Sequence, residues 1–276
     1  MIPAPFEYQR VDSVDDAIKV LTDNPDAKIL AGGHSLLPLM RLRLARPAML
    51  VDISRIQDLN SIKEEDGHLA IGALTRHHDV ATSEALQQLC PILPFTASKI
   101  GDPQVRHVGT IGGSVAHADP AGDIPTVLLA LGAELVVRGP NGETRVVGAA
   151  DFFRGLFEPD LRSNEVLTEI RVPKTAGRGW SYVKFHRRAQ DWALVGVAAL
   201  AANGTGPTVA LTNMSDRPIR AAGVEEELTA GADPAAAAAR AAEGTRPPSD
   251  AFASAEYRQE LVKVLVRRAL EEAMSR

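Results

Sequence analysis

AGGHSLL at residues 31–37 and TIGGS at residues 110–114 are the two stretches of sequence that decide how this chain folds. Paired glycines lack Cβ atoms, so a ligand can approach their backbone closely and a positive φ costs little. Successive free N–H groups in such turns can bind an anion. Ser35, Thr110 and Ser114 add hydroxyl donors. Together the two segments predict a pyrophosphate site that needs no lysine.

Neither segment matches a standard nucleotide-binding motif. Neither contains G-x-G-x-x-G, and the pattern G-x-x-x-x-G-K-[ST] is absent from the sequence. A single Gly-Gly pair is more often an ordinary turn than a ligand loop. Two such segments flanked by hydroxyl groups favour a ligand site, but their spacing does not identify the ligand.

The first glycine segment lies inside a small α/β unit. Residues 13–24 predict a helix with Ser13 as its N-cap, because apolar side chains recur at helical spacing after it. Short apolar runs at residues 27–31 and 48–53 predict two strands, with a helical stretch between them. We expect this unit to span residues 1–55.

The second glycine segment belongs to a longer region over residues 56–176. Its predicted elements are strands at 68–73 and 166–172, helices at 75–88, 94–100 and 124–131, and a glycine-rich turn at 109–113. A hairpin closed by Asn141-Gly142 is predicted from residues 133–138 and 142–147. A hinge predicted at 174–179 ends the region.

The remaining residues, 177–276, predict a third unit. Alternating strands are expected at 180–185, 194–202 and 208–213, followed by helices at 233–243 and 256–274. Strands and helices occur in all three units, and the predicted fold class is α+β.

Composition excludes several classes of protein. The 276 residues are 45% hydrophobic and 24% charged, which is typical of a globular protein. The formal charge of −5 argues against nucleic-acid binding, which usually requires a basic patch. With one cysteine, Cys90, the chain forms no internal disulfide and holds no cysteine-ligated zinc or iron–sulfur cluster. No bound metal is expected.

The sequence contains no obvious targeting signal. The opening MIPAPFEYQR lacks the basic start and apolar stretch of a secretory signal. No run of about 18 apolar residues occurs. We expect the protein in the cytoplasm, or at the inner face of the cytoplasmic membrane without crossing it.

The sequence resembles the FAD-binding medium subunits of the molybdenum hydroxylases, the xanthine dehydrogenase family, most of all its aerobic carbon monoxide dehydrogenase branch. The resemblance is carried by AGGHSLL at 31–37, IGALT at 71–75, DPQVRHVGTIGGS at 102–114, DPAGDIP at 119–125 and EVLTEIRVP at 165–173. The opening residues and the ending AEYRQELVKVLVRRAL also fit, so the resemblance covers nearly the whole chain.

The resemblance implies a fold and a set of partners. The fold would be a vanillyl-alcohol-oxidase (PCMH) type FAD-binding domain of two subdomains, with a C-terminal α+β domain of the carbon monoxide dehydrogenase flavoprotein type. FAD would be bound non-covalently. A small subunit with [2Fe–2S] clusters and a large subunit with the molybdenum cofactor would complete a dimer of heterotrimers. Electrons would pass from the clusters through FAD to a quinone or NAD, and no side chain of this chain need be catalytic.

The resemblance also assigns cofactor-binding residues. The pyrophosphate would lie on both glycine segments, at Ala31, Gly32, Gly33, His34, Ser35, Leu36, Thr110, Ile111, Gly112, Gly113 and Ser114. Asp123 would bind hydroxyl groups of FAD, and Lys184 would place a positive charge near the flavin, unless it is solvated. Ile100 and Leu167 would line the flavin pocket. Trp192 would lie near the isoalloxazine ring, with core packing as the alternative.

The sequence is also consistent with other functions. A medium subunit of a xanthine, nicotinate or aldehyde dehydrogenase fits the same residues, and a self-contained flavin dehydrogenase is a further alternative. A hydrolase does not fit, since G-x-S-x-G is absent. Arg187 and Arg188 would steer an anionic acceptor or contact a partner, unless they form a solvated surface. We also hypothesise that Asp102, Arg106 and His107 dock the iron–sulfur subunit.

Overall fold

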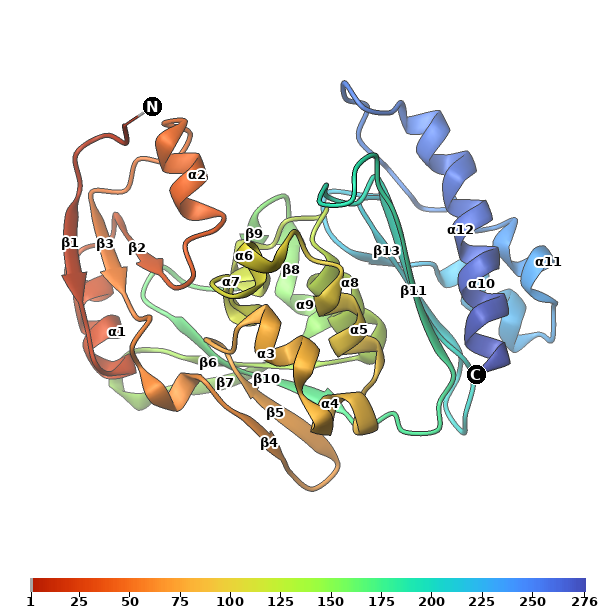
Figure 1. The fold of residues 1–276 in the computed structure, drawn as a ribbon, viewed down its shortest axis with the longest axis horizontal. Coiled ribbons are helices and arrows are strands. Elements are labelled where there is room, and N and C mark those ends of the chain that lie inside the picture. The colour runs from red at the N-terminus through yellow and green to blue at the C-terminus, as the bar shows by residue number, and fades with distance from the viewer. Residues whose placement is uncertain (1) are drawn as a thin grey trace.

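Three sheets lie side by side along the molecule (Figure 1). The structure is a computed structural model that describes residues 2–276. The first sheet is nearest the N-terminus, the second lies in the middle, and the third lies beside the C-terminal helices. Each sheet has its own group of buried apolar side chains. The α+β fold class is confirmed.

The first sheet is parallel, with strand order β1-β3-β2. Its elements are β1 (Glu7–Arg10), α1 (Val14–Asp23), β2 (Ala27–Leu30), α2 (Leu36–Arg41) and β3 (Met49–Asp52). The predicted cap of α1 is confirmed, because the Ser13 side chain accepts a hydrogen bond from the Asp16 N–H at 3.1 Å. Strand β1 was not predicted, since its four residues, EYQR, are all exposed and show no apolar pattern.

The second sheet is antiparallel, with strand order β4-β5-β10-β6-β7. Its strands are β4 (Ile62–Glu64), β5 (His68–Gly72), β6 (Glu134–Arg138), β7 (Thr144–Gly148) and β10 (Val166–Pro173). A 3-10 turn, η2 (Pro140–Gly142), closes the predicted β6–β7 hairpin, with positive φ at Asn141 and Gly142. A small hairpin of β8 (Phe153–Gly155) and β9 (Glu158–Pro159) lies apart from the main sheet.

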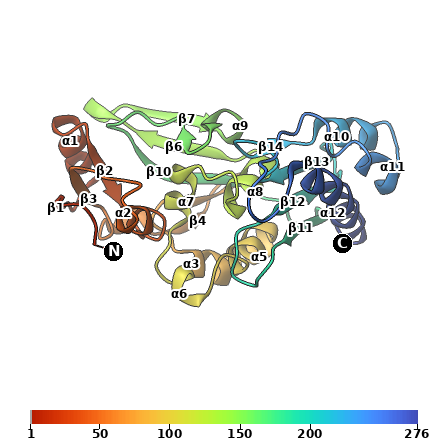
Figure 2. The same cartoon turned by 90° about the horizontal axis from the view of Figure 1, so that it is seen from above.

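Short helices pack beside the second sheet (Figure 2). They are η1 (Gln57–Leu59), α3 (His77–Thr82), α4 (Glu84–Leu89), α5 (Ile92–Ser98), α6 (Pro103–Arg106), α7 (Ile111–His117), α8 (Asp123–Leu131) and α9 (Ala149–Phe152). Every residue of α8 is buried, because the helix lies between the second and third sheets. This position places Asp123, the first residue of α8, at the junction of the two sheets.

The third sheet is antiparallel, with strand order β11-β12-β13-β14. Its elements are β11 (Trp180–Phe185), β12 (Val195–Leu200), β13 (Thr208–Thr212), β14 (Ile219–Arg220), α10 (Ala222–Thr229), α11 (Pro234–Ala238) and α12 (Ala255–Ser275). All six residues of β12 are buried, since α8 packs on one face of the sheet and α12 on the other. The strand is therefore apolar throughout instead of alternating.

Three sequence predictions are wrong in detail. The helix expected at 75–88 is two helices, because Ser83 is extended and its side chain caps α4 at the Leu86 N–H. The turn expected at 109–113 is the start of α7, capped by Thr110. The helix expected at 233–243 ends at Ala238, since an alanine run offers too little side chain to bury and short helices depend on packing.

Candidate functional site

The first glycine segment connects β2 to α2 at the carboxyl edge of the parallel sheet. Among residues 2–276, the backbone N–H groups of Gly32, Gly33, His34, Ser35 and Leu36 donate to no acceptor. Gly33 has φ +74°, a conformation that glycine adopts without strain. Five consecutive unpaired amides at the start of a helix form a site that fits the oxygens of a phosphate or pyrophosphate.

The two glycine segments meet through Gly32. A Cβ atom at Gly32 would lie 2.3 Å from the Val108 oxygen and 2.9 Å from the Gly109 Cα, so only glycine fits there. Val108 and Gly109 immediately precede the second segment. The fold therefore brings together two stretches that are more than 70 residues apart in the sequence.

The second glycine segment is packed differently from the first. Its amides donate within the protein, from Ile111 to Thr75 O, from Gly112 to Ala73 O, from Gly113 to Thr110 Oγ1 and from Ser114 to Thr110 O. Gly112 lacks a side chain because a Cβ there would lie 2.5 Å from the Ala73 Cβ. The polar groups that this segment has left to offer a ligand are the hydroxyls of Thr110 and Ser114 and the N–H of Thr110, which donates to no acceptor among the described residues. Its residues are close to the first segment, but they do not form a second set of free amides.

His77 packs against Gly109, the residue just before the second segment. No sequence pattern indicated this role. Its backbone N–H donates to the Gly109 oxygen at 3.0 Å, and its ring lies against Gly109. The side chain is buried, and Nδ1 has no hydrogen-bond partner among the described residues. Burial, together with the nearby His34 and Arg106, lowers the pKa of His77 to about 4. The imidazole is therefore neutral at neutral pH.

Asp123 and Lys184 form a buried ion pair between α8 and β11. The Lys184 Nζ lies 2.8 Å from Asp123 Oδ2, and both side chains are less than a tenth exposed. The Tyr182 hydroxyl donates to Asp123 Oδ1 at 2.5 Å. Burial raises the pKa of the Asp123 carboxyl, and the charge of Lys184 opposes this effect. A carboxylate has lone pairs left after these two contacts, so it can still accept a hydroxyl group of a ligand.

Tyr182 could have been found from the sequence. It lies two residues before Lys184 on a predicted strand, so both side chains point to the same face. His77 carried no such signal, because one histidine beside another in RHHD has no distinctive pattern.

The other predicted site residues are placed in different surroundings. Leu167 is buried in β10, and Ile100 is half-buried beside the core of the second sheet. Trp192 is 71% exposed on the connection between β11 and β12, so core packing is excluded for it. Asp102 caps α6 and Arg106 donates to the Ile100 and Gly101 oxygens, while His107 is exposed. The assignments of these residues to FAD or to a partner stay predictions.

Among residues 2–276 no group of three or more His, Cys, Asp or Glu side chains could hold a metal ion. No helix among these residues is both long and apolar enough to span a bilayer.

Known protein families match most of the chain. The family described as "FAD binding domain in molybdopterin dehydrogenase" matches residues 4–175. The family described as "CO dehydrogenase flavoprotein C-terminal domain" matches residues 180–273.

Individual proteins match over the full length. The carbon monoxide dehydrogenase medium chain of Hydrogenophaga pseudoflava is 42% identical, covering 100% of this chain and 99% of the relative. The glyceraldehyde dehydrogenase medium chain of Sulfolobus acidocaldarius is 39% identical, covering 99% of each. A solved structure of the Hydrogenophaga pseudoflava carbon monoxide dehydrogenase contains a chain that matches with a TM-score of 0.96, at 42% identity, covering 100% of this chain and 99% of that one.

Proposed function

Because the chain belongs to the family of FAD-binding medium subunits of carbon monoxide dehydrogenase and related molybdenum hydroxylases, we propose that it takes electrons from partner subunits and passes them through FAD to an external acceptor. The chain is an oxidoreductase subunit, and FAD is its cofactor. Bound flavin accepts and releases electrons by its own chemistry. The work of the protein is to hold, orient and electrostatically tune it.

The free amides of the first glycine segment carry this proposal. Gly32 to Leu36 offer five unpaired N–H donors where the backbone is bare of Cβ atoms at two positions, which fits a dinucleotide pyrophosphate. Thr110 and Ser114 would add hydroxyl donors from the neighbouring segment. Asp123 would accept from hydroxyl groups of the cofactor. Lys184 would supply a positive charge beside the flavin, where it favours the anionic reduced form.

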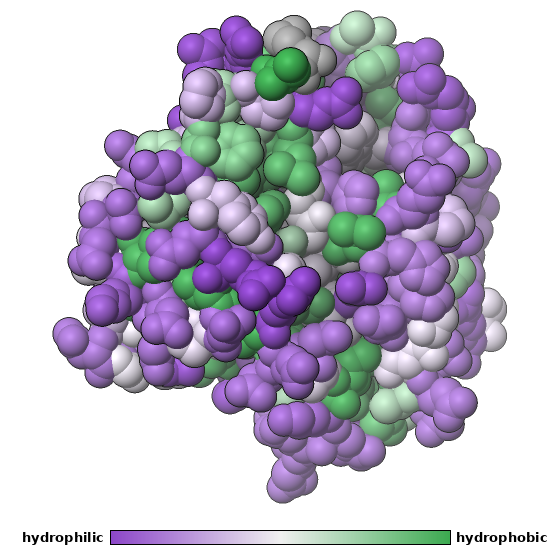
Figure 3. All heavy atoms as spheres, turned by 60° about the vertical axis from the view of Figure 1, so that its left-hand side comes forward, coloured by the Kyte–Doolittle hydropathy of each residue, from purple (hydrophilic) through white to green (hydrophobic). Residues whose placement is uncertain are grey.

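The names of the relatives as medium chains support partner subunits for this chain. Its one cysteine is fully buried, so this chain does not hold a cysteine-ligated iron–sulfur cluster, and we propose that a partner subunit carries the clusters. Figure 3 shows hydrophobic side chains gathered in places on one face within a largely hydrophilic surface. Within residues 2–55 the exposed large apolar side chains include Ile2, Phe6, Leu37, Leu42 and Leu44. Such a group supports a protein interface, in a complex that we propose is a dimer of heterotrimers.

The proposed substrate of the complex is carbon monoxide, oxidised in the molybdenum subunit. The name of the relative at 42% identity supports it. The glyceraldehyde dehydrogenase relative at 39% favours an aldehyde as the second candidate. The proposed acceptor is a quinone, with NAD as the alternative. A quinone is apolar and lies in the membrane, so we place the complex in the cytoplasm or at the inner face of the cytoplasmic membrane.

One experiment tests these proposals together. The chain is purified with its native partners, and the absorbance spectrum is recorded anaerobically before and after adding carbon monoxide or glyceraldehyde. We expect flavin and iron–sulfur bands that bleach with carbon monoxide and recover when a quinone is added. Bleaching by glyceraldehyde alone would identify the second candidate. Recovery with NAD alone would replace the quinone, and a complex without flavin would overturn the electron-transfer role.

A further inference from the structure

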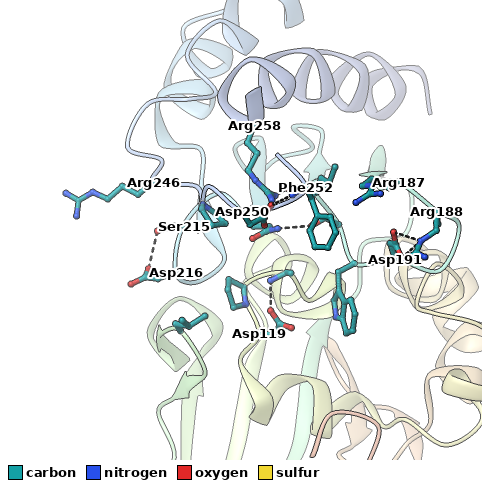
Figure 4. A pocket seen from close by; sticks show the side chains of 18 residues that line it. Asp119, Arg187, Arg188, Asp191, Ser215, Asp216, Arg246, Asp250, Phe252 and Arg258 are labelled. Atoms are coloured by element: carbon teal, nitrogen blue, oxygen red, sulfur yellow. Dashed lines mark hydrogen bonds and ion pairs between the residues drawn. The ribbon is translucent and has the colours of Figure 1, made fainter. Parts of the chain in front are cut away.

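A cavity of about 510 Å³ is lined by residues that lie close in the sequence to Asp123 and Lys184 (Figure 4). Most of its lining comes from four segments: residues 119–121 between α7 and α8, residues 187–194 between β11 and β12, residues 213–216 after β13, and residues 246–252 before α12. Leu156, between β8 and β9, and Arg258 on α12 complete the lining. The first segment directly precedes Asp123 on α8, and the second follows Lys184 on β11. The cavity therefore adjoins the part of the fold where the flavin is predicted.

Two aromatic rings are exposed at this cavity. Trp192 is 71% exposed and Phe252 is 60% exposed, although both line the cavity wall. The Arg187 guanidinium carbon lies 4.9 Å from the centre of the Phe252 ring, which fixes that ring by a cation–π contact. Figure 4 shows the Phe252 ring directed into the space between the walls, and Trp192 lines the same space. Exposed rings of this kind offer flat apolar faces for a planar ligand.

A buried arginine connects two walls of the cavity by hydrogen bonds. Arg258, on α12, is fully buried; it donates to the Leu194 oxygen on one wall and to Asp250 Oδ2 at 2.7 Å on another. Asp250 Oδ1 in turn accepts the N–H groups of Phe252 at 2.8 Å and Ala253 at 3.0 Å. The turn that presents Phe252 is thus held by a charged network, and the two walls are joined through one side chain.

The charge of the lining indicates what kind of ligand fits. Four arginines and four aspartates line the cavity, so their formal charges cancel. Arg188 pairs with Asp191 at 3.1 Å, and Arg258 pairs with Asp250. Figure 4 shows Arg246 pointing away from the Phe252 ring. Because Arg188 and Arg258 are paired within the lining, the exposed faces of the two aromatic rings are the groups that fit a neutral planar ring.

We propose that this cavity is the acceptor site, and that it binds the neutral ring of a quinone between Trp192 and Phe252. The proposal rests on the proposed function, because it requires reduced flavin in the adjoining site. The quinone takes up two electrons and two protons and becomes a hydroquinone. Fully reduced flavin gives up two electrons and, with solvent, two protons as it returns to the oxidised form, so the exchange balances.

The test uses the native complex with Phe252→Ala, and the matched control is Tyr257→Ala, an aromatic residue on α12 that is 49% exposed and does not line the cavity. The readouts are the KM for ubiquinone-1, the reduction rate of an artificial dye, and the flavin content. Loss of one stacking face should raise the KM for ubiquinone-1 about tenfold in Phe252→Ala. Phe252→Tyr, which keeps the ring, and Tyr257→Ala should leave it unchanged, and dye reduction should be unaffected in all three.

A binding measurement makes the result independent of turnover. Ubiquinone-1 is titrated into the full chain while its tryptophan fluorescence is followed, with the Trp192→Phe variant as the reference for quenching at Trp180. We expect saturable quenching in the wild type, and about tenfold weaker quenching in Phe252→Ala.

The outcomes separate the two proposals. An unchanged KM and unchanged quenching in Phe252→Ala, with full flavin, would overturn the quinone site. Loss of flavin in Phe252→Ala would also overturn it, since the cavity would then hold the isoalloxazine ring itself. A wild-type complex that contains no flavin or reduces no quinone would contradict the proposed function instead, and the fluorescence titration would still decide whether the cavity binds the ring.

Discussion

Gly32 is the single residue on which the candidate FAD site depends most. Its missing side chain lets the first glycine segment touch the Val108 oxygen. Gly32→Val should separate the two segments and abolish flavin retention, because a β-branched side chain cannot occupy a space where a Cβ would lie 2.3 Å from an oxygen atom. The flavin-to-protein ratio of the purified complex measures this.

The matched control for Gly32 is Gly206→Ala, where an added Cβ meets no atom within 4 Å. This variant should keep its flavin. Full flavin occupancy in Gly32→Val would remove the first glycine segment from the site.

His77 makes the stability of the protein depend on pH. Its pKa in the folded protein is about 4, below that of a histidine in the unfolded chain, about 6.5. The stability contributed by this neutral ring is therefore complete above about pH 6.5 and is lost as the pH falls toward 4. The free energy of unfolding should decrease by on the order of 3 kcal/mol across this range because of His77.

Urea unfolding at several pH values between 7 and 4 tests the role of His77. In His77→Phe the decrease with falling pH should be smaller than in the wild type. Equal slopes in His77→Phe and wild type would show that His77 is not the group that titrates.

At the scale of the helix, Thr110 is the N-cap of α7, the helix that contains most of the second glycine segment. Its side chain accepts the Gly113 N–H at 3.1 Å and begins α7. Thr110→Ala should destabilise the protein by about 1 kcal/mol, the usual cost of a lost N-cap, and should weaken FAD binding. Thr110→Ser, which keeps the hydroxyl, should be close to wild type. Urea unfolding curves of the two variants make the comparison, and equal loss in both would mean that the cap is not responsible.

At the scale of the whole molecule, the Asp123–Lys184 pair joins the second and third sheets. Asp123→Ala leaves the buried Lys184 with only the Lys99 oxygen, at 3.3 Å. We expect a loss of about 3–5 kcal/mol in the free energy of unfolding, because an unpaired buried charge is costly. FAD affinity should fall by about 1–3 kcal/mol if Asp123 also binds the cofactor.

A double-mutant cycle with Lys184→Met separates the two effects of Asp123. The double variant should recover part of the stability but none of the FAD affinity. Additive losses of stability would show that the pair does not link the sheets, and unchanged affinity in Asp123→Ala would remove this residue from the site.

Features that depend on near neighbours in the chain were predictable. The Ser13 cap, the β6–β7 hairpin and most helices and strands followed from residues within about one helical turn or one strand pair. The error at residues 109–113 has a local cause as well. Two adjacent glycines predict a turn, because glycine disfavours helices. Here the packing of Gly112 against Ala73 and the Thr110 cap outweigh that preference, and the segment is helical.

The sequence by itself determined the family, the cofactor class and the two glycine segments, because each of these depends on short continuous motifs. Only the tertiary structure decided that Gly32 lies against Val108, that Asp123 meets Tyr182 and Lys184 across 59 and 61 residues, and that four separate segments enclose one cavity. Hydrophobic periodicity and capping residues in a sequence indicate only the contacts between residues that are a few positions apart. Contacts across tens of residues depend on how the three sheets pack, and packing is set by the shape and burial of all their side chains together.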